Sequence, residues 1–188
     1  LKEGEPKYVN SSGWTRYTKG AMFYGLHKAK KNPPPLYIFE GYADVVTASQ
    51  VGLRNAVALA CKTLSKEQIR LLSQEGLTKV VVCLDGDEEG QKGIDQVLNT
   101  LISAETFDVQ IVQLPKDQDP DDFLKGAKNL DSFKKLRHYT PFEWKLEQST
   151  LSMTKDPHDL AIEMVPTIRQ EQNRIARDRM IKALSQYT

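Results

Sequence analysis

The stretch Val80-Val81-Val82-Cys83-Leu84-Asp85-Gly86-Asp87 decides the fold, because a continuous apolar run leads directly into two carboxylates. An apolar run without alternation predicts a strand that is buried on both faces, as in a parallel sheet covered by helices. Ligands of such sheets bind beyond the carboxyl ends of the strands, which is where Asp85 and Asp87 stand. The stretch therefore predicts an α/β fold with an acidic site at one edge of the sheet.

Three more apolar runs have the same character, and helical patterns separate them. These strands are expected at residues 36–39, 56–60 and 109–114, and helices at residues 43–51, between Ser65 and Gly76, and at about 89–101. Glu40 follows the first strand, and Asp117-Gln118-Asp119-Pro120-Asp121-Asp122 follows the last one. Acidic residues thus stand after three of the four strands, which predicts a parallel sheet with helices on both faces and carboxylates gathered at its C-terminal edge.

After Lys125 the pattern predicts helices only, in a C-terminal helical subdomain of roughly 60 residues. The expected helices are at residues 131–139, 141–149, 157–163 and 169–185. The triple proline Pro33-Pro34-Pro35 marks a boundary on the other side of the sheet domain. We therefore expect three regions, at residues 1–32, 33–127 and 128–188.

The composition is that of an ordinary globular protein, with 188 residues, 39% hydrophobic and 27% charged residues. The chain has no apolar run long enough to span a membrane and no signal-peptide pattern, so a cytoplasmic location is expected. Two cysteines without a C-x-x-C pattern give neither a disulfide framework nor a zinc site.

The net charge of +1 conceals a segregation of charge along the chain. Residues 1–31 hold seven basic and two acidic residues, residues 85–122 eleven acidic and two basic, and residues 166–188 five basic and two acidic. Such charge runs are often only solvated surfaces. The same pattern also suits an acidic, metal-binding centre that is flanked by surfaces for a polyanion.

Clustered carboxylates raise one another's pKa unless a cation neutralises them, and hard oxygen ligands favour Mg²⁺ or Mn²⁺. A single aspartate after a strand is often only a helix cap, but three acidic clusters at strand ends favour a metal site. An EF-hand is excluded because Gln96 stands where its twelfth residue is a glutamate. The absence of a G-x-x-x-x-G-K-[ST] motif argues against a nucleotide motor.

The three acidic motifs Glu40-Gly41-Tyr42-x-Asp44, Asp85-Gly86-Asp87-x-x-Gly90 and Asp119-Pro120-Asp121 together resemble the TOPRIM fold, a Rossmann-like parallel sheet. Primases, topoisomerases and some nucleases share this fold. More specifically, the chain is similar to the RNA polymerase domain of bacterial DnaG-type primases. Further similarity lies in Pro6-Lys7-Tyr8-Val9-Asn10-Ser11, in Lys19-Gly20 and at residues 175–181.

The resemblance implies roles for individual residues. It implies that Glu40 is the general acid or base and that it also helps to bind metal. It implies two or more divalent ions, Mg²⁺ or Mn²⁺ and no zinc, bound by the carboxylates of Asp85, Asp87, Asp119 and Asp121. Gly41 and Asp44 would position these ligands without binding the metal themselves. Contacts to nucleic acid or nucleotide are expected from Lys7, Asn10 and Lys19, and also from Lys62, which follows Cys61 where the family has small residues.

The implied activity is that of a DNA-directed RNA polymerase of the primase type, a nucleotidyltransferase that makes short RNA primers for DNA replication. Its partners would be a single-stranded DNA template, ribonucleoside triphosphates and the RNA–DNA hybrid product, with no membrane. The resemblance also implies that residues 1–32 are the remnant of a basic N-terminal subdomain. A replicative helicase would bind through a domain beyond Thr188.

Two alternatives stay open at the level of sequence. One keeps the fold but assigns a TOPRIM nuclease or topoisomerase, although no tyrosine nucleophile is identified. The other is a catalytically silent module that binds nucleic acid through its basic flanks alone. A DNA affinity that depends on salt but ignores Mg²⁺ and the acidic residues would favour the silent module.

Overall fold

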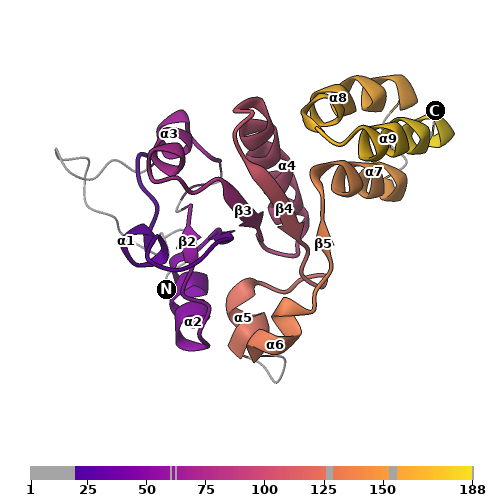
Figure 1. The fold of residues 1–188 in the computed structure, drawn as a ribbon. Coiled ribbons are helices and arrows are strands. Elements are labelled where there is room, and N and C mark those ends of the chain that lie inside the picture. Colours follow the sequence, from indigo (N-terminus) through magenta and orange to yellow (C-terminus); the bar gives the residue numbers. More distant parts are fainter. Residues whose placement is uncertain (1–19, 60, 62, 126–128, 153–155, 188) are drawn as a thin grey trace.

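A five-stranded sheet organises the computed structural model, which describes residues 20–59, 61, 63–125, 129–152 and 156–187 (Figure 1). The strand order is β2-β1-β3-β4-β5. The first four strands are parallel, and β5 runs antiparallel to β4. The strands are β1 (Leu36–Phe39), β2 (Ala56–Ala58), β3 (Lys79–Val82), β4 (Asp108–Val112) and β5 (His138–Tyr139). The expected α/β fold with a parallel sheet is confirmed for the four predicted strands.

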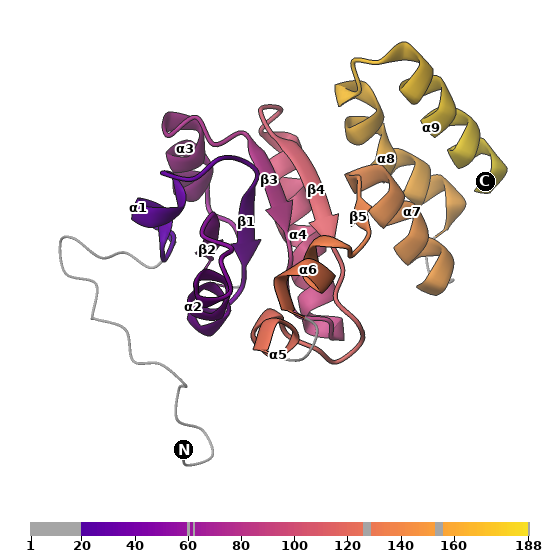
Figure 2. The ribbon, with the colours of Figure 1, turned by 60° about the horizontal axis from the view of Figure 1, so that its bottom comes forward.

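Helices cover both faces of this sheet, as its apolar strands require (Figures 1 and 2). Along each strand the side chains alternate between the faces, so Ile38 packs into one core and Tyr37 and Phe39 into the other. Leu72 and Leu98 close the first core, and Phe123 closes the second one. The helices are α1 (Leu26–Ala29), α2 (Tyr42–Gln50), α3 (Lys66–Gln74), α4 (Glu88–Ser103), α5 (Pro120–Lys125), α6 (Asn129–Lys134), α7 (Pro141–Ser152), α8 (Pro157–Gln170) and α9 (Arg174–Tyr187).

The fifth strand is absent from the sequence-based prediction, which expected one helix over residues 131–139. That prediction is wrong, because α6 ends at Lys134 and β5 then pairs Tyr139 with Ile111 of β4. The short strand covers an edge of β4 that would otherwise expose unpaired backbone groups. Pro141 favours an extended conformation in the residue before it and starts α7 immediately afterwards.

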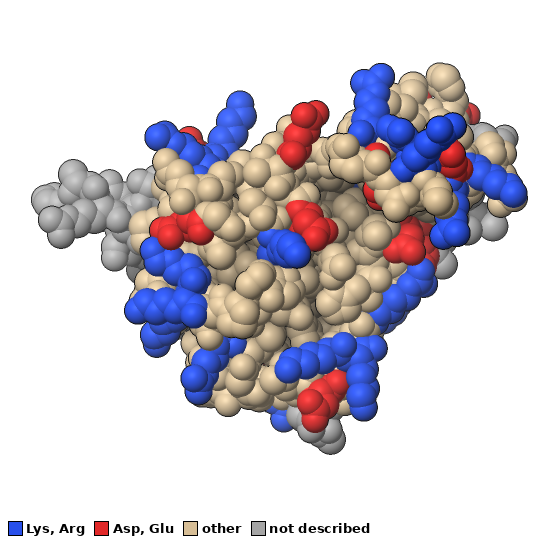
Figure 3. Space-filling view, in the orientation of Figure 1, with Lys and Arg blue, Asp and Glu red and all other residues tan. Residues whose placement is uncertain are grey.

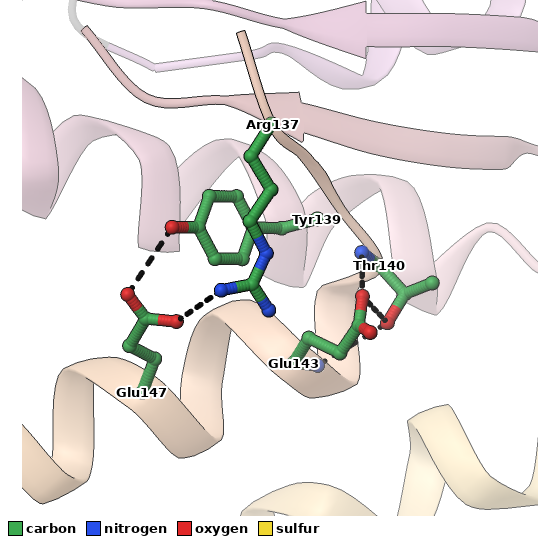
Figure 4. Close-up of polar contacts among 5 residues, drawn as sticks. All are labelled: Arg137, Tyr139, Thr140, Glu143 and Glu147. Atoms are coloured by element: carbon green, nitrogen blue, oxygen red, sulfur yellow. Dashed lines mark hydrogen bonds and ion pairs between the residues drawn. The ribbon is translucent and has the colours of Figure 1, made fainter.

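A polar network fixes the junction between β5 and α7 (Figure 4). The guanidinium carbon of Arg137 lies 4.2 Å from the centre of the Tyr139 ring. Glu147 accepts a 3.1 Å hydrogen bond from the Tyr139 hydroxyl and pairs with Arg137 at 3.2 Å. Thr140 caps α7, since its hydroxyl accepts a hydrogen bond from the Glu143 amide. Burial and the Glu147 carboxylate raise the pKa of Tyr139.

The predicted start of the last helix, which was expected over residues 169–185, is also wrong. Helix α8 continues through Pro166 as far as Gln170, and α9 begins only at Arg174. Asn173 caps α9, because its side-chain oxygen accepts hydrogen bonds from the amides of Ile175 and Ala176.

Helices α7, α8 and α9 form a third apolar cluster that lies beside α4 and β5 (Figure 2). Phe142, Leu160, Met164 and Leu184 are its buried members. Polar contacts dock this cluster on α4, where Trp144 donates a 3.3 Å hydrogen bond to Asp95. A helical C-terminal part is therefore present, while the region boundaries at residues 32 and 127 stay predictions.

Candidate metal and nucleotide site

Three loops at the C-terminal ends of β1, β3 and β4 bring the predicted acidic residues to one edge of the sheet. The register pairs Phe39 with Ala58, Ile38 with Val82, and Val82 with Ile111. Because the parallel strands end side by side, the loops that follow them are neighbours. A cavity of about 190 Å³ lies between these loops, and its lining includes Glu40, Gly41, Asp44, Asp85, Asp119 and Asp121.

The first loop turns tightly from β1 into α2. The Gly41 amide donates a 2.8 Å hydrogen bond to the carboxylate of Asp44, which holds this buried side chain against the cavity. A Cβ atom at residue 41 would lie 3.0 Å from the same carboxylate oxygen. Glycine therefore allows the Asp44 carboxylate to lie directly against the backbone of the turn.

The second loop needs glycine at two positions because backbone carbonyl groups approach both of them closely. A Cβ atom at Gly86 would lie 2.3 Å from the carbonyl oxygen of Pro115, and one at Gly90 would lie 2.1 Å from the carbonyl oxygen of Asp85. Asp87 caps α4 by accepting a 2.7 Å hydrogen bond from the Gly90 amide. This packing accounts for the spacing of the Asp85-Gly86-Asp87-x-x-Gly90 motif.

The third loop orients two carboxylates through the start of α5. Asp119 accepts a 2.6 Å hydrogen bond from the Asp122 amide. The Asp121 carboxylate accepts a hydrogen bond from the Thr47 hydroxyl of α2 and pairs with Lys125 at 2.5 Å. Sequence reasoning missed these two contacts of Asp121. The spacing of four residues to Lys125 was a readable helical signal, whereas Thr47 is distant in the sequence.

Burial and the neighbouring carboxylates raise the pKa values of two aspartates at the small cavity. Burial, followed by the charge of Glu40 and then those of Asp44, Asp119 and Asp87, raises the pKa of Asp85 to about 7. Burial is also the main reason why the pKa of Asp44 is raised to about 6, and a smaller part comes from Asp119 and Asp121. Such mutual destabilisation is the expected property of carboxylates that are arranged to receive a cation.

Asp87 faces a second, larger cavity and does not line the first one. This cavity of about 640 Å³ lies between the loops after β3 and β4, and its lining includes Asp87, Glu88, Gln113, Lys116 and Asp117. The prediction treated Asp85 and Asp87 as one pair, and the structure places them at two different cavities. Gln113 and Lys116 were not singled out for a site, and Asp117 was named only as part of the acidic run after the last strand. The acidic residue Asp117 adopts a left-handed conformation, with φ at 58°.

The donors suit a hard divalent cation, because all of them are carboxylate oxygens. Within the described ranges, however, no three side chains of histidine, cysteine, aspartate or glutamate are placed to hold one ion together. Lys7, Asn10, Lys19 and Lys62, the residues expected to contact nucleic acid or nucleotide, lie outside the described residues. In the described part of the chain, no helix has both the length and the apolar character that a membrane crossing requires.

The three acidic loops lie within a stretch of the chain that resembles a known family. The Toprim-like family model matches residues 37–124, which contain all three acidic motifs. The chain is also similar to several DNA primases. It is 29% identical over 190 residues to DNA primase of Enterococcus faecalis, covering 96% of this chain and 30% of that protein. It is 34% identical over 138 residues to DNA primase of Pseudomonas putida, covering 71% of this chain and 21% of that protein.

Solved structures give the same result. A DNA primase domain from Pseudomonas aeruginosa has a TM-score of 0.79 and 27% identity, over 99% of this chain and 61% of that one. A DnaG primase catalytic domain bound to single-stranded DNA has a TM-score of 0.76 and 25% identity, over 98% of this chain and 62% of that one. The chain is thus similar to the Toprim-like family over residues 37–124 and to a DnaG primase catalytic domain over nearly its whole length. It spans less than a third of the length of the two primases named above.

Proposed function

We propose that this chain is the catalytic core of a DNA primase, which synthesises short RNA primers on single-stranded DNA by nucleotidyl transfer. The observation that carries the proposal is the convergence of carboxylates from three strand ends on one cavity. The similarity to DNA primases and to a DnaG primase catalytic domain supports it. In the reaction, the 3′-hydroxyl of the growing primer attacks the α-phosphate of a ribonucleoside triphosphate, and pyrophosphate leaves.

We assign the metal to the carboxylates of Glu40, Asp85, Asp87, Asp119 and Asp121. Mg²⁺ or Mn²⁺ bound there would activate the attacking oxygen and stabilise the charge on the leaving group. Glu40 is the proposed general base, because it stands directly after β1 and lines the cavity beside Asp85. Asp44 and Gly41 position the first loop through the hydrogen bond between them.

The division of roles follows from the two cavities. Asp85 lines the small cavity, and its raised pKa means that a bound cation must displace a proton near neutral pH. Asp87 faces the larger cavity, where Lys116 supplies a positive charge for the phosphates of a nucleotide. We therefore place the nucleotide in the larger cavity, with the reacting oxygens at the loop that carries both Asp85 and Asp87.

The partners that this function requires are a single-stranded DNA template, ribonucleoside triphosphates and the RNA–DNA hybrid product. Lys7, Asn10, Lys19 and Lys62 are the proposed contacts to template or nucleotide. A replicative helicase is the proposed partner of the longer protein. Replication of the chromosome or of a mobile element would place the protein in the cytoplasm.

The test is primer synthesis by the purified chain on single-stranded DNA with labelled ribonucleoside triphosphates and Mn²⁺. We expect template-dependent RNA products from the wild type and none from Asp85→Asn. Asp108→Asn is the matched control, because this exposed aspartate begins β4 at the opposite end of the strand. Cleavage of labelled DNA without RNA synthesis would contradict the proposal and indicate a nuclease. Equal synthesis by wild type and Asp85→Asn would contradict the assigned site.

A further inference from the structure

Helix α9 carries a dense group of cationic side chains that the proposed reaction does not use. We call this group the α9 basic surface. Its members are Arg174, Arg177, Arg179 and Lys182. Arg174, Arg179 and Lys182 are exposed, and Arg177 is half-buried. Asp178 is the single acidic residue in the sequence of α9. In Figure 3, Lys and Arg side chains gather over the part of the molecule where Figure 1 shows α8 and α9.

Helix stability does not explain these charges. The amino end of a helix carries a partial positive charge, so cations in the first turn are unfavourable and acidic residues are favoured there. The first turn of α9 contains no acidic residue, and Arg174 is its first residue. Arg174 is 88% exposed and lies 4.0 Å from Asp178, which is itself 67% exposed. An exposed pair at this distance contributes little to stability, so the arginine is available to a ligand.

Apolar side chains are exposed on the same helix. Ile175 is 65% exposed and Ile181 is 50% exposed, although buried positions are available to apolar residues elsewhere on α9, as at Leu184. Single-stranded DNA presents both phosphates and unstacked base faces, whereas a duplex buries its base faces inside the stack. Cations interleaved with aliphatic side chains therefore fit a single strand better than a duplex.

We propose that the α9 basic surface binds the backbone of single-stranded DNA outside the reaction centre. The identification of that strand as the template rests on the proposed primase function. In Figures 1 and 2, α9 lies at the opposite side of the molecule from α2, which flanks the acidic cavity. Template bound at α9 is therefore a distal segment, and its loss weakens DNA binding without altering the chemical step.

The test measures the affinity for a labelled oligothymidine strand across a series of salt concentrations. Every cation that contacts a phosphate of single-stranded DNA contributes about 0.7 to the slope of log affinity against log salt. Replacing all four members of the α9 basic surface by glutamine should therefore reduce the slope by about 2 to 3 and the affinity by roughly tenfold or more. A matched control removes four exposed cations elsewhere and should change both quantities much less. The control positions are Arg54, Lys79, Lys134 and Lys135.

A second variant keeps the test independent of how the fourfold variant folds. Asp178→Asn removes the single negative charge from α9 and should strengthen binding of the oligonucleotide. Equal losses in the fourfold variant and its control would overturn the proposal. The proposal would also be overturned if a duplex of the same length bound wild type as tightly as the single strand does and showed the same reduction of the salt slope in the fourfold variant. An Asp178→Asn variant with wild-type affinity for the oligonucleotide would overturn it too.

Primer synthesis at saturating DNA separates this proposal from the proposed function. The fourfold variant should retain the wild-type rate there, because none of its residues lies at the acidic cavities. A wild type that binds the oligonucleotide but makes no primer would count against the primase function alone. A fourfold variant with a reduced rate at saturating DNA would contradict the assignment of α9 to distal binding.

Discussion

The backbone amide of Gly86 donates a 2.8 Å hydrogen bond to the carbonyl oxygen of Gln118. This bond joins the loop that carries Asp85 and Asp87 to the loop that carries Asp119. The two acidic loops after β3 and β4 are therefore one packed unit, and the position of each depends on the other.

Gly86→Ala should disrupt this unit. Its new Cβ atom would lie 2.3 Å from the Pro115 carbonyl oxygen, and a backbone atom has little freedom to move away. We expect a loss of about 1–3 kcal/mol in the free energy of unfolding, measured in urea, together with weaker Mn²⁺ binding. Gly93→Ala is the control, because its Cβ atom meets only the end of the flexible Leu84 side chain at 3.1 Å. Equal stability of the two variants would contradict the close packing.

The stability of the metal-free protein should fall as the pH rises from about 4 to about 7. Asp85 has a pKa of about 7 and Asp44 a pKa of about 6 in the folded protein, against an ordinary value of 3.8. Between these values the folded state binds more protons than the unfolded state, so raising the pH favours unfolding. Above about pH 7 both states are ionised at these positions and the effect is constant.

Asp85→Asn removes most of this dependence, because the amide does not titrate. Thermal unfolding in the presence of a chelator should show the variant gaining stability over wild type between pH 5 and pH 8. Asp108→Asn should follow the wild-type curve. A constant difference between Asp85→Asn and wild type across this range would refute the crowding of the carboxylates.

Thr47→Val should weaken metal binding without unfolding the protein. The Thr47 hydroxyl donates a hydrogen bond to the Asp121 carboxylate, and valine keeps the shape of the side chain while removing that donor. Loss of a group that orients a metal ligand typically lowers metal affinity by about 10-fold or more, which calorimetry with Mn²⁺ measures. Thr167→Val is the control, since the buried hydroxyl of Thr167 has no hydrogen-bond partner within the described residues. Equal Mn²⁺ affinities in both variants would show that Thr47 has no such role.

Lys145→Met should loosen the helical part from the sheet domain. Lys145 is 4% exposed, and its ammonium group lies 2.7 Å from Asn99 of α4 and 2.8 Å from Glu163 of α8. Removing one partner of a buried pair is costly, so we expect a loss of about 2–4 kcal/mol in denaturant unfolding. The exposed Lys135→Met serves as the control. A loss no larger than that of the control would mean that the contacts of Lys145 do not stabilise the docking of α7 and α8 on α4.

The sheet and its acidic edge could be predicted because their signals are local. Apolar runs without alternation mark buried parallel strands, and the acidic motifs follow directly after them. Strand β5 could not be predicted in this way, because two residues carry no periodicity and its pairing depends on the exposed edge of β4. The start of α9 was predicted at residue 169, shortly after Pro166. In the structure α8 continues through Pro166, and α9 begins only after its cap at Asn173.

The site was predicted less completely than the fold, since spacing does not fix the direction of a side chain. Asp85 and Asp87 stand two residues apart, and yet they line different cavities because Asp87 turns to cap α4. The contact of Thr47 with Asp121 joins residues 74 positions apart. Only the packing of α5 against α2 brings these two residues together.

The most direct test of the central claim, a divalent metal site built from the strand-end carboxylates, is a calorimetric titration with Mn²⁺. Wild type should bind Mn²⁺ with millimolar or tighter affinity. The double variant Asp85→Asn/Asp87→Asn, which preserves the shape of both side chains, should lose this binding. A matched double variant, Glu105→Gln/Asp108→Asn, removes two exposed carboxylates near the start of β4 and should bind as wild type does. Unchanged Mn²⁺ binding in the Asp85→Asn/Asp87→Asn variant would contradict the claim.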